Sequence, residues 1–265
     1  MRTILITAAL IAVFIGVAMA QQTGTFTDGR DGKTYKTVRI GGYAWMAENL
    51  NYQTDSGSWC YRNNADNCKK YGRLYDWETA MAACPAGWRL SSDADWGWLK
   101  AMADGGEYKG TAGKRLKSKS GWNKQNNGRD GNGTDDFGFS ALPGGTVNPY
   151  VISDNYNFVF GIRYSYDDSR FEEIGEDGVW WTSTECCWWD DDCRDDNDGY
   201  WRATLEYDGC CYWRTITEYG SYYAYNQARN RVMSNSHDGV AYKTSNYKSN
   251  GHSVRCVSDK LFISP

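Results

Sequence analysis

The stretch GRLYDWETAMAACPAGWRLSSDADWGWLKAMADGG, residues 72–106, carries the clearest helix signals in the chain. In its first half, apolar residues fall at three- and four-residue steps, and Pro85 with Gly87 stops the pattern. In its second half, Ser91 or Ser92 can cap a helix whose first turn is acidic, and Gly105-Gly106 can end it. The stretch therefore predicts two helices joined by a brief extended piece, WRL. The apolar face of the first helix comprises Leu74, Trp77, Ala80, Met81 and Cys84.

The segments around these helices read mainly as strands and loops. TYKTVRI (34–40) alternates polar and apolar residues, and Gly41-Gly42 can turn it into YAWMAENL (43–50) as a hairpin. The segments 146–178 and 212–252 show no strong periodicity, and neither a repeat nor a linker is present. We therefore expect one α+β domain over residues 21–265. Further strand candidates are FGFSAL (137–142), VWWTSTE (179–185), GYWRATLEY (199–207) and SVRCV (253–257).

The first twenty residues, MRTILITAALIAVFIGVAMA, have the pattern of a secretory signal peptide. Arg2 precedes an apolar run, and Ala18-Met19-Ala20 forms a cleavage signal. A retained membrane anchor is the alternative, but the run is short for a span, and no later segment is apolar enough. We expect a secreted or cell-surface protein without a membrane span after cleavage.

Composition points away from nucleic acid and toward an aromatic core. The chain has 13 Trp, 20 Tyr and 29 Gly but only 4 Pro, and aliphatic residues are sparse after the signal. The net charge is −4, and residues 186–211 hold eight acids against two arginines, so the acidity is local. No basic patch marks a nucleic-acid surface.

The nine cysteines all follow the signal, so an exported chain should oxidise most of them. Cys60 and Cys68 enclose a polar loop of seven residues, which predicts a local disulfide. The odd count leaves at least one thiol free or bonded to another molecule. Cys193 is either that thiol or a partner of Cys186 or Cys187. The pairing within the cluster Cys186, Cys187, Cys193, Cys210 and Cys211 stays open.

The part of the chain that holds these five cysteines is also the leading candidate for ligand binding. Rigid aromatics beside Asp, Asn, Ser and Gly are typical of adaptable binding surfaces, and they suit glycans as well as proteins. The alternatives are a solvated acidic hairpin tip and, for about half of the aromatics, a place in the core. The predicted ligand-binding residues are Trp188, Trp189, Asp190, Asp192, Tyr200, Trp213, Tyr222, Tyr223 and Tyr225.

Metal and catalytic signals are weaker. In GRDGNGTDDFG (128–138), Asp130, Asn132 and Asp135 resemble the start of a calcium loop, but residue 141 is Ala where such a loop has Glu. Structural calcium and an ordinary Asx-turn loop both remain open. No C-x-x-C, G-x-S-x-G or phosphate-loop motif appears. His237 and His252 are expected in loops, and neither lies in a recognisable motif with a nucleophile. We therefore expect no cofactor unless calcium binds, and no catalytic residue.

Six blocks of the chain, in order along it, carry a family resemblance: residues 26–52, 58–81, 84–99, 133–145, 180–185 and 252–257. They resemble the Fibrobacter succinogenes major paralogous domain, an exported or surface-associated bacterial group without an activity common to it. The resemblance implies a C-type-lectin-like fold, related to formylglycine-generating enzymes. In this fold two early helices pack on small twisted antiparallel sheets with long ordered loops. A cysteine ending the first helix bonds one in the last strand, and Cys84 and Cys256 hold those positions.

Two chemistries of that fold class do not carry over. The acidic motifs through which lectins bind sugar by calcium are missing, and Val147-Asn148-Pro149-Tyr150 is the nearest piece. The paired copper-binding cysteines before the final strand are missing too. The sequence therefore predicts an exported, non-enzymatic binding or adhesion domain for a glycan or cell-surface protein. The alternatives are an exported enzyme acting on polysaccharide and a diversified, hypervariable ligand-binding protein.

Overall fold

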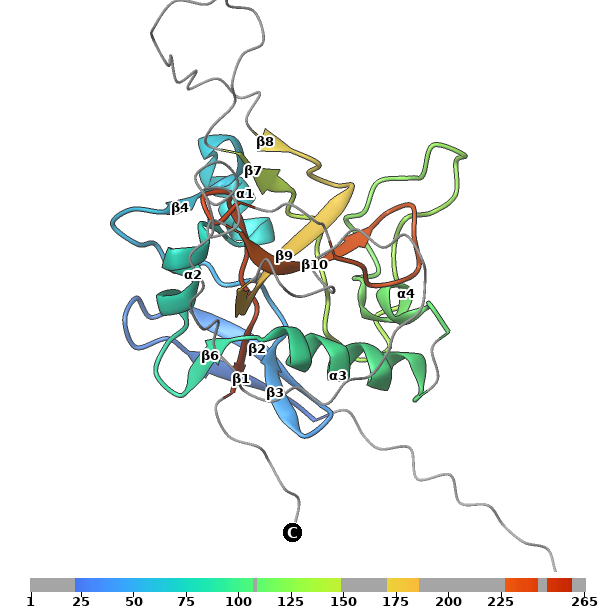
Figure 1. Ribbon diagram of the computed structural model, residues 1–265, viewed down its shortest axis with the longest axis horizontal. Helices are drawn as coiled ribbons and strands as arrows, with labels where there is room; N and C mark the ends of the chain where they lie inside the picture. The colour runs from blue at the N-terminus through green and yellow to red at the C-terminus, as the bar shows by residue number, and fades with distance from the viewer. Residues whose placement is uncertain (1–21, 107–108, 149–170, 186–226, 243–246, 259–265) are drawn as a thin grey trace, which may run out of the picture.

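The computed structural model describes residues 22–106, 109–148, 171–185, 227–242 and 247–258, and they form a mixed α+β structure (Figure 1). The predicted signal peptide and the strand predicted at 199–207 lie outside these residues. Among the helices that the structure describes, none is long and apolar enough to cross a membrane.

The first sheet has the strand order β1-β2-β3-β12-β6 and is antiparallel throughout. Its last strand along the chain, β12, lies between β3 and β6 and pairs with both. The N-terminal hairpin and the C-terminal strand therefore share one sheet. The strands are β1 (Thr23–Thr27), β2 (Thr34–Ile40), β3 (Tyr43–Met46), β6 (Trp88–Leu90) and β12 (Cys256–Ser258).

The second sheet has the strand order β10-β9-β11-β5-β4. The long pair β9–β10 is antiparallel, whereas β11 runs parallel to β9 and antiparallel to β5. A two-stranded pair, β7 (Thr146–Val147) and β8 (Phe171–Glu172), adds a separate ladder. The strands of the second sheet are β4 (Ser58–Trp59), β5 (Leu74–Tyr75), β9 (Asp177–Glu185), β10 (Ala228–Ser234) and β11 (His252–Ser253).

The glycine turn predicted between residues 40 and 43 is present. Gly41 and Gly42 have φ of 62° and 88°, the left-handed values that a two-residue hairpin requires at both positions. The turn sets the register of β2 and β3, with Ile40 opposite Tyr43. The predicted strand at 34–40 is confirmed with the same bounds.

Both predicted helices are present, and their caps explain their bounds. The helix α2 (Trp77–Ala83) starts at Asp76, whose carboxylate accepts from Thr79 N at 2.8 Å. The helix α3 (Asp93–Asp104) starts at Ser92 with a full capping box and ends at the left-handed Gly105. The first helix is shorter than expected, because Leu74 belongs to β5, and Met81 is 44% exposed instead of buried.

Two short helices and a turn of 3₁₀ helix escaped prediction. The 3₁₀ turn η1 (Tyr61–Asn63) leads into α1 (Ala65–Tyr71), and α4 (Ala112–Leu116) follows α3. Each is too short to show a periodic apolar face. Their apolar residues are nevertheless buried, among them Tyr61 and Leu116.

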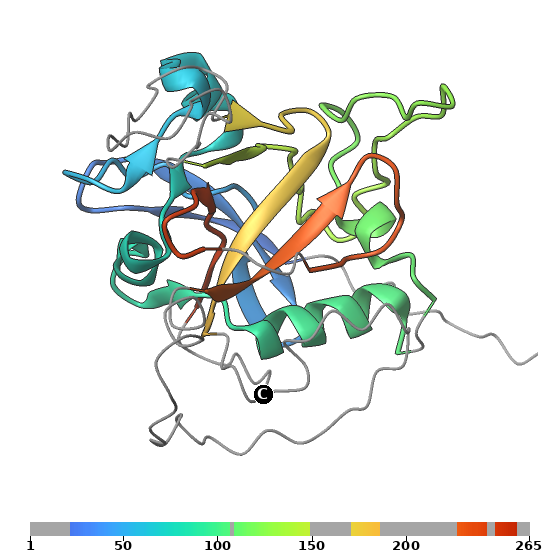
Figure 2. The same cartoon turned by 45° about the horizontal axis from the view of Figure 1, so that its top comes forward.

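Tryptophan rings from three elements meet in the main core, as the aromatic composition predicts. Trp45 of β3, Trp96 of α3 and Trp180 of β9 are almost fully buried. Trp96 contacts the other two at ring-centroid distances of 5.7 and 5.6 Å, and Phe139 packs edge-on against it. The helix α3 thereby packs against both sheets, and in Figure 2 it lies below the paired strands β9 and β10.

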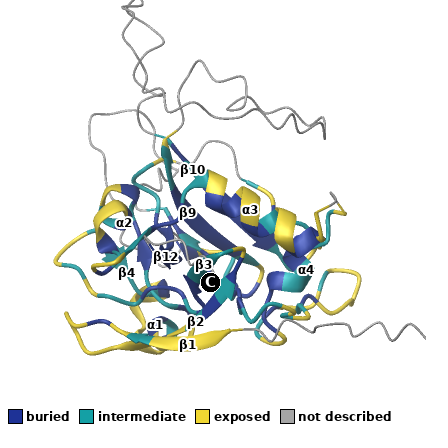
Figure 3. Ribbon diagram, turned by 90° about the horizontal axis from the view of Figure 1, so that it is seen from below, coloured by how far each residue is buried: buried dark blue, intermediate teal, exposed yellow. Residues whose placement is uncertain are grey.

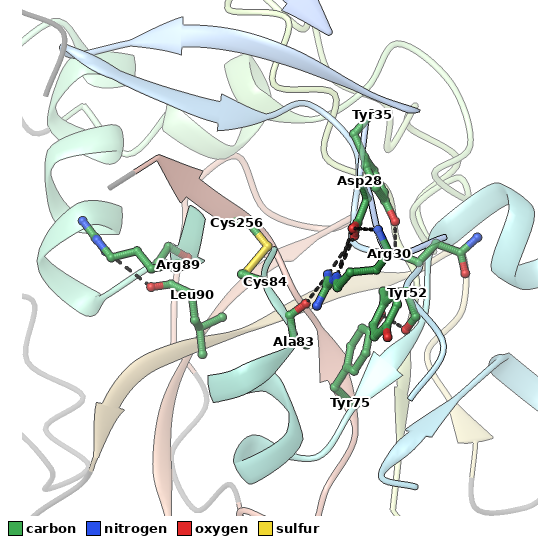
Figure 4. The surroundings of a disulfide bond; sticks show 12 residues. Asp28, Arg30, Tyr35, Tyr52, Tyr75, Ala83, Cys84, Arg89, Leu90 and Cys256 are labelled. Carbon is green, nitrogen blue, oxygen red and sulfur yellow. Dashed lines mark hydrogen bonds and ion pairs between the residues drawn. A yellow bond between two sulfur atoms is a disulfide. The ribbon is translucent and has the colours of Figure 1, made fainter. Parts of the chain in front are cut away.

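Both predicted disulfides are confirmed. Cys60–Cys68 closes the polar loop at η1, and Cys84–Cys256 joins the end of α2 to β12 across 172 residues (Figure 4). The five other cysteines all fall in 186–211, outside the described residues. Because the four framework cysteines pair with one another, the odd cysteine expected from the count must belong to that group.

Arg30 makes several hydrogen bonds beside the Cys84–Cys256 disulfide. The Arg30 guanidinium donates to both carboxylate oxygens of Asp28 and to Ala83 O at 2.8 Å, at the end of α2 (Figure 4). It also lies 3.8 Å from the centre of the Tyr52 ring. These hydrogen bonds from Arg30 hold the pKa of the Asp28 carboxyl below its usual value.

Three strand predictions need correction. Residues 137–142 form no strand, because Ser140 adopts φ of 51° and only Ala141 bridges, to Lys117. The strand expected at 253–257 is two strands, β11 and β12, separated by Val254 and Arg255. The segment 212–252 was expected to be irregular, but it contains β10, which pairs with β9.

Candidate functional site

All nine predicted ligand-binding residues lie in the segment 186–226, outside the described residues. The structure describes the base from which this segment starts and to which it returns. Glu185, the last residue of β9, is the register partner of Ala228, the first residue of β10. Gln227 also bridges to Tyr247. The residues on either side of the segment therefore lie together at one end of the β9–β10 ladder.

A lysine holds the first end of the segment in place. The Lys248 ammonium forms an ion pair with Glu185 and a longer one, at 3.7 Å, with Glu78 of α2. It also lies 4.3 Å from the centre of the Trp77 ring, and Lys248 O accepts from Trp77 N at 2.8 Å. The Lys248 side chain is only 13% exposed, but the side chains of Glu185 and Glu78 are 53% and 74% exposed, so water screens both ion pairs from the carboxylate side.

Asp93, at the N-terminus of α3, holds the strand β10 that follows the segment. The Asp93 carboxylate pairs with Arg231 at 2.6 Å and with Arg229 at 3.3 Å, both on β10. The backbone N–H of Asp93 donates to Thr184 Oγ1 at 3.1 Å on β9. One helix terminus thus ties together the two strands that lead into and out of 186–226.

Buried indoles make this base rigid. Trp77 Nε1 donates to Thr182 O at 2.8 Å, and Trp181 Nε1 donates to Tyr75 O at 2.7 Å. Trp181 is fully buried, in keeping with the expectation that about half of the aromatics form core. Because each indole links β9 to the α2 region, the base can hardly move without breaking buried hydrogen bonds.

The predicted calcium loop is held by its own hydrogen bonds. Asp130 Oδ1 accepts from the backbone and side-chain nitrogens of Asn132, as in an Asx turn, and Asn132 Oδ1 accepts from Trp122 N. Both carboxylate oxygens of Asp135 accept from Ser140. The oxygens predicted as ligands are thus largely engaged by neighbouring donors.

Cations from α4 and the residue after it hold the loops around this site. Lys114 Nζ donates to Asn132 O at 2.6 Å, and Arg115 pairs with Asp136 and lowers the pKa of that carboxyl. Lys117 Nζ donates to Ser234 O and His237 O, and burial lowers the pKa of Lys117 to about 8. At neutral pH the ammonium stays largely charged, so it can bridge both carbonyls.

Calcium is expected to have little effect on stability, because these donors occupy the loop. Thermal unfolding in 5 mM calcium and in EDTA should differ by less than about 1 °C. A bound structural calcium at 100 times its Kd would add about 2.7 kcal/mol, which is roughly 5–10 °C for a chain of this size. A shift of that size, lost in Asp130→Ala but kept in Asp55→Ala, would restore the calcium prediction.

The two histidines occupy different surroundings. His237 is exposed in a turn, where its Nδ1 lies 2.8 Å from Ser236 Oγ. His252 was expected in a loop, but it lies in β11 and is 2% exposed. Its ring packs at a tilt against Trp181, and its Nδ1 lies 2.9 Å from Thr146 Oγ1. Within the described residues, no group of three or more His, Cys, Asp or Glu side chains is placed to hold a metal ion.

A comparison with protein families places these elements in a known group. The model of the Fibrobacter succinogenes major domain matches residues 38–187, more than half of the chain. The chain belongs to the Fibrobacter succinogenes major domain family. No curated protein and no solved structure matches it.

The fold of this Fibrobacter succinogenes major domain extends beyond the matched residues. The match begins within β2 and stops two residues after β9. The strands β10, β11 and β12 follow it, yet they complete both sheets, and Cys256 closes the long disulfide. The segment 186–226 therefore connects β9, which lies within the match, to its partner β10, which lies beyond it.

The sequence alone did not reveal the residues that hold the two ends of the segment 186–226. Asp93 was assigned only a helix-start role, and Lys248 and Arg229 carried no signal of their own. Their partners lie far along the chain, 63 residues away for Lys248–Glu185 and 136 for Arg229–Asp93. Such pairs become visible only once the strands are in register.

Proposed function

We propose that this chain is an exported, non-enzymatic binding domain that presents residues 186–226 to a glycan or cell-surface protein. One observation carries the proposal. This aromatic, Asp-rich segment is flanked by Glu185 and Ala228, which are register partners at the end of the β9–β10 ladder. Variable loops on a rigid scaffold are a common way to build binding surfaces. The residues proposed to contact the ligand are those predicted from the sequence.

The composition of the segment supports binding. It combines tryptophan and tyrosine with aspartate, asparagine, serine and glycine. Aromatic side chains supply contact area at low entropic cost, and the small polar residues adapt their hydrogen bonds to the ligand. The core cluster, the α3 caps and the two disulfides that the structure describes are formed by residues outside this segment.

We further propose that the fold is of the C-type-lectin-like type. Three features support this: β12 lies beside β3, Cys84 at the end of α2 bonds Cys256 in β12, and α2 and α3 come early in the chain. In this proposal the segment 186–226 belongs to the long loop region of that fold. The predicted signal peptide supports the secreted or cell-surface location.

The proposal is tested by binding of the mature chain to a glycan array, to polysaccharides and to intact cells. We expect wild type to bind one of these, and the triple variant Trp188→Ala, Trp189→Ala, Trp213→Ala to lose at least about tenfold in affinity. Trp98→Ala, which removes an exposed indole from α3, is the matched control and should keep binding. No binding by wild type, or equal binding by the triple variant, would contradict the proposal.

A further inference from the structure

Asn132 begins a sequence pattern that N-linked glycosylation requires. The acceptor pattern is N-x-S or N-x-T with any residue but proline at x, and Asn132-Gly133-Thr134 meets it. Along the whole sequence, no other asparagine has serine or threonine two residues later. Asp130 adds an acid two residues before the asparagine, which gives the longer form D-x-N-x-T that bacterial oligosaccharyltransferases use. The loop of the predicted calcium site thus also contains an acceptor pattern for a sugar.

The two ends of the Asn132 amide lie in different surroundings. Oδ1 accepts from the backbone N–H of Trp122 at 3.0 Å, and Trp122 is buried in the main core. Nδ2 donates to the carboxylate of the exposed Asp130 at 2.7 Å. Among the residues that the structure describes, the second N–H of Nδ2 has no acceptor. The nitrogen that would carry a sugar therefore lies on the more exposed side of the amide, with one hydrogen to spare.

A sugar on this nitrogen is compatible with the folded loop. N-glycosylation replaces one of the two amide hydrogens and leaves the amide oxygen an acceptor. The hydrogen bonds of Asn132 with Trp122 N and with Asp130 can therefore both persist. Residues 126–130 and Thr134 are exposed, and Figure 3 shows exposed residues along the loop beside α4. A sugar at Nδ2 thus faces an exposed loop and displaces no hydrogen bond of Asn132.

The folded loop nevertheless holds the acceptor pattern too tightly for an enzyme to take it up. A Cβ on Gly133 would lie 2.0 Å from Lys117 O, and Gly133 N donates to Ser118 O at 2.8 Å. Thr134 N and Thr134 Oγ1 both donate to Lys114 O, at 2.8 and 3.3 Å. A transferase that reads the threonine needs these groups free, so the loop has to be open when the sugar is attached. The newly exported, still unfolded chain meets this condition.

We propose that Asn132 is an N-glycosylation site, modified on the newly exported chain before this loop folds. The donor is an oligosaccharide joined through its anomeric carbon to a lipid pyrophosphate. The bond from that carbon to the phosphate oxygen breaks, a bond from the carbon to Nδ2 forms, Nδ2 releases one proton, and the lipid pyrophosphate leaves. The inference rests on the export proposed above, because this transfer takes place outside the cytoplasm. It does not depend on the ligand of the segment 186–226.

Mass spectrometry of the chain purified from the bacterium that makes it tests the site. Trypsin cleavage after Arg129 gives a peptide that begins at Asp130, and we expect this peptide to carry the mass of an oligosaccharide. Asn132→Gln and Thr134→Val should abolish the modification, whereas Thr134→Ser, which keeps a hydroxyl, should retain it. Asn127→Gln is the matched control and should be modified like wild type, because Asn127 is exposed in the same loop and precedes a glycine but lacks the hydroxyl residue.

A purified enzyme tests the order of events. A synthetic peptide of residues 126–138 and the folded, unmodified chain are each incubated with a bacterial oligosaccharyltransferase and its lipid-linked donor. The peptide should be modified at least about tenfold faster, because the folded chain has to open this loop first. Equal rates would contradict the proposed order of modification and folding.

The N-terminal peptide from the same tryptic digest separates this inference from the export on which it rests. A chain that has lost its signal peptide but carries an unmodified Asn132 would overturn the glycosylation and leave the export standing. An unmodified chain that retains the signal peptide would overturn both. Modification that persists in Thr134→Val, or that is lost in Thr134→Ser, would show that the acceptor pattern is not what is recognised, and it would also overturn the site.

Discussion

Asn49→Ala is expected to lower the free energy of unfolding by about 3–5 kcal/mol. Asn49 Oδ1 accepts from Trp180 Nε1 at 2.8 Å and from Arg255 Nη2 at 2.8 Å. Its Nδ2 donates to Tyr71 O at 2.8 Å and to Ser253 Oγ at 3.3 Å. One side chain, only 5% exposed, thus links the N-terminal hairpin to the second sheet and to Arg255.

The expected cost comes mainly from the guanidinium. Arg255 is fully buried, burial lowers its pKa to about 9, and it is therefore still charged at neutral pH. It donates to Asn49, to Met46 O and to Phe139 O at 2.6 Å, and it lies 4.3 Å from the centre of the Phe139 ring. Without Asn49, the buried charge keeps two carbonyl acceptors among the residues that the structure describes, which is the costly situation for an ion in a protein core.

Urea unfolding with disulfides intact measures this loss. Asn51→Ala is the matched control, because the hydrogen bonds of Asn51 involve its backbone, and its effect should stay within about 0.5 kcal/mol. Asn49→Asp keeps the acceptor beside Arg255 but loses the amide donors, so it should cost less than alanine. If Asn49→Ala were as mild as the control, the buried network would not be what joins the two sheets.

Local signals explain what the sequence could predict. Ser92 and Gly105 bound α3, Gly41-Gly42 bends the hairpin, and the apolar run of β9 marks a buried strand. Each of these needs only neighbouring residues. The elements that failed depend on distant partners: in β10, Asn230 and Arg231 are buried, and Arg231 is neutralised by Asp93 from α3. From the sequence alone, a segment with two arginines is predicted to be a loop. It can be a buried strand only because Asp93 neutralises the buried Arg231.

The error at 137–142 shows a different limit. Phe139 and Ala141 are both fully buried, so the alternation correctly indicated burial. The conformation was wrong, because Asp135 accepts from the backbone and hydroxyl of Ser140 and holds it at a positive φ. The pattern of apolar residues thus located the core, while a polar contact five residues away determined the backbone. For the segment 186–226, the sequence remains the basis of the binding prediction.

Removing the Cys84–Cys256 disulfide is expected to cost about 5 kcal/mol, and removing Cys60–Cys68 about 2.5 kcal/mol. The difference follows from loop length, because a cross-link restricts the unfolded chain more when it joins distant residues, and the separations are 172 and 8. The double variants Cys84→Ala, Cys256→Ala and Cys60→Ala, Cys68→Ala, unfolded in urea, provide the comparison.

The dependence on urea concentration separates this entropic effect from a packing defect. Cys256 is fully buried, so alanine there also leaves a cavity in the folded state. A cavity lowers stability without altering the surface exposed on unfolding, whereas loss of a long cross-link lets the unfolded chain expand and raises the m-value. We therefore expect a larger m-value for the Cys84, Cys256 variant and a nearly unchanged one for Cys60, Cys68. Equal losses with unchanged m-values would mean that native packing, and not loop closure, accounts for the contribution of the long disulfide.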